Sequence, residues 1–153
     1  MSNLRTNAAR VVLILLAAAA VTLPSLAEAR VAVALDSAIF VERTSQKKGR
    51  TLEPARRLSR GDRVVYIVTW TRQAGAGSFV VTNPLPRTVY YQESADESEQ
   101  VSIDGGRSWG KLDAMRVGSR LATPEDVTHV RWRISAPVAA RGSGQIAYSA
   151  IVR

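Results

Sequence analysis

Alternation of apolar and polar residues limits this chain to β-structure over most of its length. Between residues 64 and 70, apolar side chains stand at every second position, the spacing that places them on one face of a strand. The same spacing recurs twice near the end of the chain. The predicted inward positions are Val64, Tyr66, Val68 and Trp70, then Val130, Trp132 and Ile134, then Ile146, Tyr148, Ala150 and Val152. No stretch beyond residue 29 shows helical spacing over a comparable length, so the pattern predicts an all-β chain.

Turn-forming residues divide the remainder into short segments. Residues 31–41, 79–82 and 88–92 are predicted to be strands, and residues 100–112 are predicted to be a hairpin. Residues 42–59 are polar and basic and predict a mobile loop, with an irregular strand near Leu52. The resulting total of about seven or eight strands is the density expected of an immunoglobulin-like antiparallel β-sandwich.

The first 29 residues predict a cleavable signal peptide. Arg5 and Arg10 precede an apolar run from residue 11 to residue 23, which is shorter than the ~20 residues that cross a bilayer. Ala27-Glu28-Ala29 supplies the small-x-small pattern before the predicted cleavage site between Ala29 and Arg30, and no cysteine follows the run to carry a lipid. We therefore expect residues 30–153 to form one periplasmic or secreted domain with no later membrane span.

Charge and cysteine content narrow the partners expected of such a domain. The chain has a net charge of +8 and no cysteine, so disulfides, thiolate metal sites and thiol nucleophiles are excluded. Most of the positive excess lies before residue 72. Its candidate anion or partner contacts are Lys47, Lys48, Arg56 and Arg57. These residues indicate either a solvated surface or a site for an acidic polysaccharide or lipopolysaccharide, and export argues against a nucleic-acid partner.

Two segments of the chain resemble a known repeat. Gly61-Asp62-Arg63-Val64-Val65-Tyr66 opens an alternating strand, and Val80-Val81-Thr82-Asn83-Pro84-Leu85-Pro86 ends an apolar strand. With the closing strand after Gly142-Ser143-Gly144, they resemble DUF11 (domain of unknown function 11), a repeat of envelope proteins, over nearly all of residues 31–153. The resemblance implies a sandwich with a structural or adhesive role and carries over no catalytic residues. The family usually has Asn-x-Gly after the central strand, whereas this chain has Arg72-Gln73-Ala74-Gly75. The departure bears on the conformation of this loop and not on the fold.

Residues 102–109 match the Asp-box pattern Ser-x-Asp-x-Gly-x-Ser-Trp. Asp104 is predicted to accept hydrogen bonds from the amides of its own turn, Gly106 to adopt a positive φ, and Trp109 to pack back on the strand. The motif resembles the turns of sialidase-type propellers, where it lies away from the active site. A propeller needs many such blades, and one copy favours a structural turn over a glycoside hydrolase.

No catalytic, cofactor or metal residues are assigned from the sequence. His129 is the only histidine, and no Ser/His/Asp arrangement accompanies it. The acidic segment from Glu93 to Glu99 indicates a solvated loop, with a weak calcium site left open. Of the adjacent pair Tyr90 and Tyr91 one ring must face outward, and Tyr91 is the predicted ligand contact.

These features together predict a non-enzymatic envelope module with a structural or protein-interaction role. The alternative is a carbohydrate- or lipopolysaccharide-binding module that uses the basic N-terminal segment.

Overall fold

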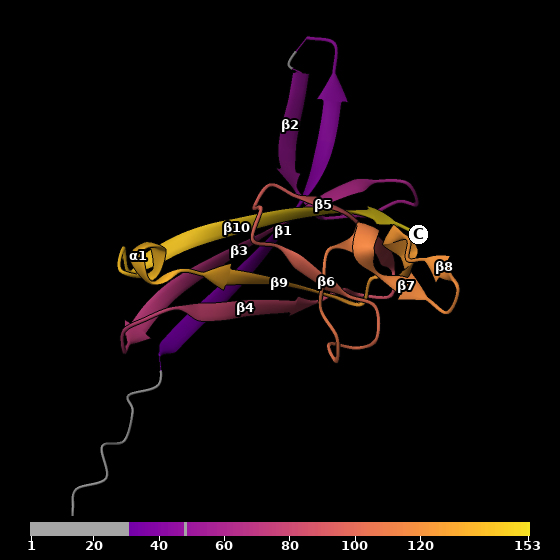
Figure 1. Cartoon of the computed structure of the whole chain (residues 1–153). Helices are drawn as coiled ribbons and strands as arrows, with labels where there is room; N and C mark the ends of the chain where they lie inside the picture. The colour runs from indigo at the N-terminus through magenta and orange to yellow at the C-terminus, as the bar shows by residue number, and fades with distance from the viewer. Residues whose placement is uncertain (1–30, 48) are drawn as a thin grey trace, which may run out of the picture.

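Antiparallel strands make up most of the computed structural model, which describes residues 31–47 and 49–153 (Figure 1). The predicted signal peptide, its cleavage site at Ala29 and Arg30, and Lys48 lie outside the described residues. The strands are β1 (Ala32–Ser45), β2 (Gly49–Pro54), β3 (Arg63–Ala74), β4 (Phe79–Pro84), β5 (Val89–Ser94), β6 (Gln100–Ser102), β7 (Arg116–Val117), β8 (Arg120–Leu121), β9 (His129–Ile134) and β10 (Ser143–Val152). The helices are η1 (Leu112–Ala114), η2 (Pro124–Asp126) and α1 (Ala136–Ala139). The prediction of an all-β chain is confirmed.

Two sheets contain the longer strands. The larger has the order β2-β1-β3-β10-β5, and the smaller has the order β4-β9-β6. β7 and β8 form a separate two-stranded sheet, and every strand pair is antiparallel. In Figure 1, β4 and β9 of the smaller sheet run alongside β3 and β10 of the larger sheet.

Strand β3 lies at the middle of the larger sheet because its alternation lets one face be buried while both edges are paired. Buried and half-buried residues alternate from Arg63 to Trp70. β1 pairs with one edge, from Ala32 opposite Ala74 to Val41 opposite Val64, and β10 pairs with the other edge. The predicted inward positions of β3 are therefore confirmed.

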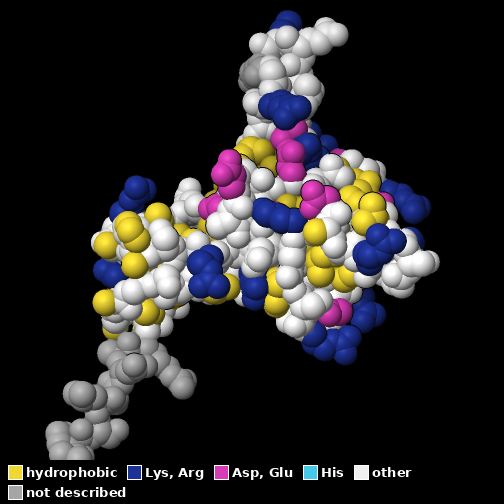
Figure 2. Space-filling model, in the orientation of Figure 1, with side chains coloured by type: hydrophobic (Ala, Val, Ile, Leu, Met, Phe, Trp, Pro, Cys, Tyr) yellow, Lys and Arg dark blue, Asp and Glu magenta, His cyan; other side chains and the backbone are white. Residues whose placement is uncertain are grey.

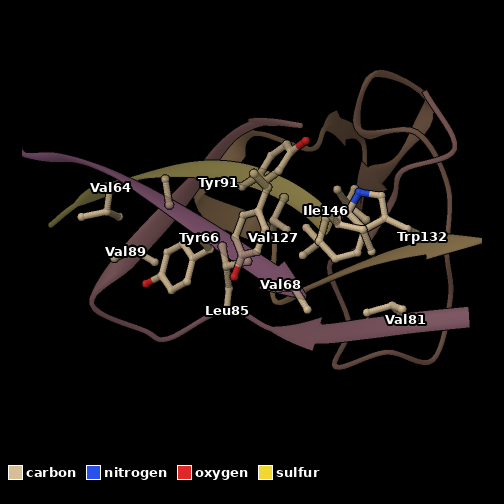
Figure 3. Close-up of a cluster of buried hydrophobic side chains, with 14 of the residues drawn as sticks. Val64, Tyr66, Val68, Val81, Leu85, Val89, Tyr91, Val127, Trp132 and Ile146 are labelled. Atoms are coloured by element: carbon tan, nitrogen blue, oxygen red, sulfur yellow. The ribbon is translucent and has the colours of Figure 1, made fainter. Parts of the chain in front are cut away.

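Aromatic side chains join the two sheets into one core (Figure 3). Trp132 of β9 packs against Tyr148 of β10 with ring centroids 5.5 Å apart, and Trp70 of β3 meets Phe79 of β4 edge to face at 5.3 Å. Trp70 and Trp132 are almost completely buried. Burial of such large rings supplies much of the stabilisation of a chain without disulfides.

The segment from residue 42 to residue 59 differs from its predicted form. It is not a mobile loop, because β1 continues to Ser45 and pairs with β2, from Phe40 opposite Pro54 to Ser45 opposite Gly49. Most of its side chains are exposed on both faces, so its sequence shows no alternation. The backbone ladder holds it instead, and Gly49 has a positive φ of 66° at the turn.

The segment of residues 100–112 also differs from the predicted hairpin. β6 takes β9 as its ladder partner, and only a bridge between Val101 and Gly110 closes the intervening turn. The turn therefore spans more residues than Asp104 to Arg107.

Within the part of the chain that the structure describes, no helix has the length and apolar character needed to cross a membrane.

Gly144 provides a test of the packing between β10 and β3. It lies opposite Trp70, and a Cβ atom there would stand 2.5 Å from Cζ2 of the indole ring. Because that ring is fixed in the core, Gly144→Ala should lower the free energy of unfolding by about 1–3 kcal/mol, measured by urea denaturation.

Gly110→Ala is the matched control, because its added methyl would meet only the flexible side chain of Met115 at 3.5 Å. We expect a change within about 0.5 kcal/mol for this variant. Equal stability of the two variants would show that Trp70 is not held as described.

Candidate functional site

The predicted anion contacts gather on a projecting hairpin and at its base. We call residues 40–54 the arm, a hairpin of β1 and β2 that projects beyond the other strands of the larger sheet (Figure 1). Lys47 is exposed near its tip, while Arg56 and Arg57 are exposed where the chain leaves β2. In the space-filling view, a basic side chain lies at the end of the arm and charged side chains of both signs lie at its base (Figure 2).

A shallow hollow of about 350 Å³ lies at the base of the arm. It is lined by Val41, Arg43, Glu53, Pro54, Arg56 and Arg57. Arg43 is already paired, because its Nη1 lies 3.0 Å from Oδ1 of Asp62. In the described residues, no carboxylate lies within 4.0 Å of Arg56, Arg57 or Lys47, so these three cations remain able to meet an external anion.

Asp62 fixes the chain at the other side of this hollow. The backbone amide of Ser59 donates to Oδ2 of Asp62 at 2.8 Å, and Arg43 donates to Oδ1. These bonds lower the pKa of the Asp62 carboxyl, with the Ser59 amide as the largest cause. The Gly61-Asp62 pair that opens the resemblance thus anchors the arm through Arg43.

The Asp-box segment forms a turn organised around one carboxylate. Oδ1 of Asp104 accepts from the amides of Arg107 and Ser108 at 3.0 and 2.9 Å and from the hydroxyl of Ser102 at 2.8 Å. Oδ2 accepts from the hydroxyl of Ser108 at 2.6 Å. Gly106 has a φ of 88°, and its carbonyl accepts from the indole of Trp109 at 2.9 Å.

The hydrogen bonds to Asp104 hold its pKa far below the usual value for a carboxyl. The side chain and amide of Ser108 are the largest causes, followed by the hydroxyl of Ser102. A carboxylate held in this way is suited to ordering a turn, whereas a general acid needs a proton near neutral pH.

Trp109 is likewise held by side chains of the same domain. The guanidinium of Arg131 lies 4.4 Å from the centre of its ring, and His129 meets it edge to face at 6.3 Å. Nδ1 of His129 lies 3.1 Å from the hydroxyl of Thr128, and Arg131 also donates to Gln100 at 2.9 Å. These contacts tie the turn to β9.

The two adjacent tyrosines are placed differently from the prediction. Tyr91 is only 5% exposed, and its hydroxyl donates to Glu99 at 2.7 Å, so it presents no ring to a ligand. Burial, with the bond to Glu99, raises the pKa of Tyr91 well above its usual value. Tyr90 is the outward member, half-buried beside Arg153, whose guanidinium lies 5.9 Å from its ring centre.

The acidic residues between positions 93 and 99 are divided among separate partners. Glu93 contacts Arg63, Glu99 lies 3.3 Å from Nζ of Lys111, and Asp96 accepts from the amide of Ser98. Among the described residues, no group of three acidic, histidine or cysteine side chains is arranged to hold a metal ion.

Two polar contacts between distant segments were not predicted. The hydroxyl of Thr128 accepts from the amide of Gly105 at 3.0 Å and thereby joins the Asp-box turn to β9. Glu42 lies 3.6 Å from both Arg50 and Arg63, which stabilises the side of the arm. The contacts of Gly105 with Thr128 and of Glu42 with Arg63 have no local sequence signal, because only the tertiary fold brings these residues together. Glu42 and Arg50 meet across the hairpin of β1 and β2, which the sequence did not predict.

Comparison with known proteins adds no relative: no family model, no curated protein and no solved structure matches this chain.

The carboxylate of Asp104 predicts a pH-dependent contribution to stability. Because its pKa is lower in the folded than in the unfolded chain, the stabilisation is present above about pH 4 and is lost as the pH falls further. Asp104→Asn should therefore lower stability at pH 7 and reduce the acid dependence of the melting temperature, measured by circular dichroism between about pH 2 and pH 7.

Asp113→Asn serves as the control, since Asp113 is exposed and has no hydrogen-bond or ion-pair partner in the described residues. Its melting curves should follow those of the wild type. An unchanged acid dependence in Asp104→Asn would exclude the role given to this carboxylate.

Proposed function

We propose that this chain is an exported, non-enzymatic interaction module of the cell envelope, periplasmic or secreted, that contacts its partner through the arm. The observation that carries the proposal is the arm itself. It projects from a well-packed core, and Lys47, Arg56 and Arg57 meet no carboxylate in the described residues. A projecting two-stranded hairpin contributes little to a core, so its form fits a role in recognition.

The contacts of the polar side chains support a non-enzymatic role. Asp104 is engaged by its own turn, and Tyr91 and Glu99 bond each other. His129 is bonded to Thr128 and packed against Trp109. These groups are used in holding the fold together.

A second candidate is binding of an acidic polysaccharide or lipopolysaccharide at the same place. It is favoured by the hollow at the base of the arm, where Arg56 and Arg57 stand side by side in the sequence and are both exposed. Guanidinium groups match carboxylate and phosphate in a bidentate geometry, which suits such polymers.

We also propose that the two sheets form an immunoglobulin-like sandwich of the DUF11 type. Without β2, the larger sheet places the first, third, tenth and fifth strands side by side, and the smaller holds three strands, the numbers found in an immunoglobulin constant domain. The order differs at two positions, which are exchanged. In the larger sheet, β10 lies next to β3, where the fifth immunoglobulin strand belongs. In the smaller sheet, β6 lies next to β9, where the final immunoglobulin strand belongs.

The export part of the proposal predicts a defined N-terminus. Expressed in a bacterial host with its own leader, the chain should be recovered outside the cytoplasm with Arg30 as its first residue, measured by intact-mass spectrometry. Ala29→Arg should block cleavage, because the peptidase site needs a small side chain. Recovery of the uncleaved wild-type chain would contradict this part of the proposal.

The arm predicts salt-sensitive binding to an anionic polymer. Replacement of Lys47, Arg56 and Arg57 by Gln should weaken binding to lipopolysaccharide about 10-fold or more at low salt, given the usual contribution of exposed ion pairs. Isothermal titration calorimetry at low and at physiological ionic strength measures both the affinity and its screening.

A variant that removes the same charge elsewhere is the control. Arg87, Arg133 and Arg141 are exposed and belong neither to the arm nor to the hollow at its base, so their replacement by Gln should leave the affinity within about threefold of wild type. Equal losses in the two triple variants would show a general effect of net charge. Absence of lipopolysaccharide binding in the wild type would leave the protein-interaction role and remove the second candidate.

A further inference from the structure

One part of β1 is an open sheet edge. β1 pairs with β3 from Ala32 to Val41, but β2 covers its other side only from Phe40 onward. Residues 34–39 are all exposed, and in the described residues no strand pairs with that side of residues 32–39. Ile39, at the end next to β2, is the one position whose outward carbonyl is already bonded in the described residues, by the amide of Ala55. We call residues 32–39 the free edge.

The direction of the backbone groups on this edge follows from two backbone hydrogen bonds. The carbonyl of Ile39 accepts from the amide of Ala55, so it points to the side of β2. The amide of Arg72 bonds Gly142 next to β10, so the neighbouring Thr71, opposite Ala34, points to β1. Because directions alternate along a strand, Val33, Leu35 and Ser37 present their amides and carbonyls to the open side.

The side chains of the free edge are unusually apolar for an open strand. Leu35 and Ile39 are 51% and 40% exposed, although both belong to the face that buries Val41. Open edges in proteins are usually protected by lysine, proline, bulges or a covering segment. Residues 32–39 contain a single charge, Asp36, and no lysine or proline, and their one irregularity lies at the start, between Ala32 and Val33.

We propose that the free edge binds the free edge of a second copy of this chain, antiparallel and about a twofold axis at Leu35. β1 of the second copy then lies on the same side of β1 as β2. The two strands follow one another end to end along that side. The pairing uses a part of β1 outside the arm and does not depend on the function proposed above. It gives an isologous interface, the commonest form of homodimer contact.

The register of the two copies of β1 is limited by the part of this edge that β2 already occupies. With Leu35 opposite Leu35 of the second copy, Val33 faces Ser37, and the pairing ends before Ile39, whose carbonyl already accepts from the amide of Ala55. This register forms about six hydrogen bonds between outward-pointing groups. A shift toward Pro54, the C-terminal end of β2, would place Val33 against Val41, whose edge Glu53 of β2 occupies.

Charge excludes the intermediate register. Centring the pair on Asp36 would set two carboxylates directly opposite each other, which destabilises a strand pair. In the Leu35 register Asp36 lies opposite Ala34. The antiparallel arrangement also sends the two basic arms to opposite ends of the dimer, so their charges are well separated.

The size of the contact predicts a weak dimer. One strand pair with a few apolar side chains is smaller than the ~1,000 Å² expected of a stable interface. We therefore expect a concentration-dependent monomer–dimer equilibrium with a dissociation constant on the order of 10 to 1,000 μM.

The absence of cysteine allows a direct test by cross-linking. In the chain purified after export, Leu35→Cys should form a disulfide-linked dimer on mild oxidation, since paired Cα atoms lie about 5.5 Å apart. Ser37→Cys is the matched control on the same strand and face. Its two copies would lie roughly 13 Å apart and should remain monomeric.

Sedimentation equilibrium of the chain without cysteine measures the association itself. Leu35→Lys should weaken dimerisation at least about 10-fold, because it sets like charges opposite each other. Leu121→Lys is the control, since Leu121 is 54% exposed on β8, away from the free edge, and should leave association unchanged. Circular dichroism of each variant verifies folding.

Three results would overturn the pairing. They are a wild-type monomer at about 1 mM, a cross-link at Ser37→Cys in preference to Leu35→Cys, and an association that Leu35→Lys does not change. Each of these is independent of whether the arm binds lipopolysaccharide.

Discussion

The packing around Tyr148 is the interaction on which the rest of the structure depends. Its ring stacks on Tyr66 at 4.8 Å with 3° between the planes, and Trp132 of the other sheet lies against it at 5.5 Å. Its hydroxyl accepts from the side-chain amide of Asn83 at 2.6 Å. Tyr148 thus contacts both sheets, which places β3, β4, β9 and β10 around one buried phenol, and this burial raises its pKa.

The strands with one buried face could be predicted from the sequence. In β3, β9 and β10, apolar residues at every second position meet a core that is buried on only that side, so the pattern and the structure agree. The arm could not be predicted in this way. Apart from Val41 at its base, none of its described residues is buried, and a backbone ladder with a glycine turn leaves no apolar pattern.

At the candidate site, features held by local contacts could be predicted from the sequence, and features held by non-local contacts could not. The Asp-box turn is predictable because Asp104 bonds residues within four positions of itself. Tyr91 was assigned to the outside because alternation alone does not say which of two adjacent rings is buried. Its contact with Glu99, and the pairing of Ile151 with Tyr90 on β10, decide the matter only in the folded chain.

The position of β10 governs when the protein can complete its fold. The final strand lies between β3 and β5, so the larger sheet stays divided until residues 143–152 are available to join it. Strand pairs that join such distant segments form slowly, because much of the chain must be ordered before they close. For the exported role proposed above, a larger sheet that closes only with residues 143–152 fits a chain that must cross a membrane before it folds.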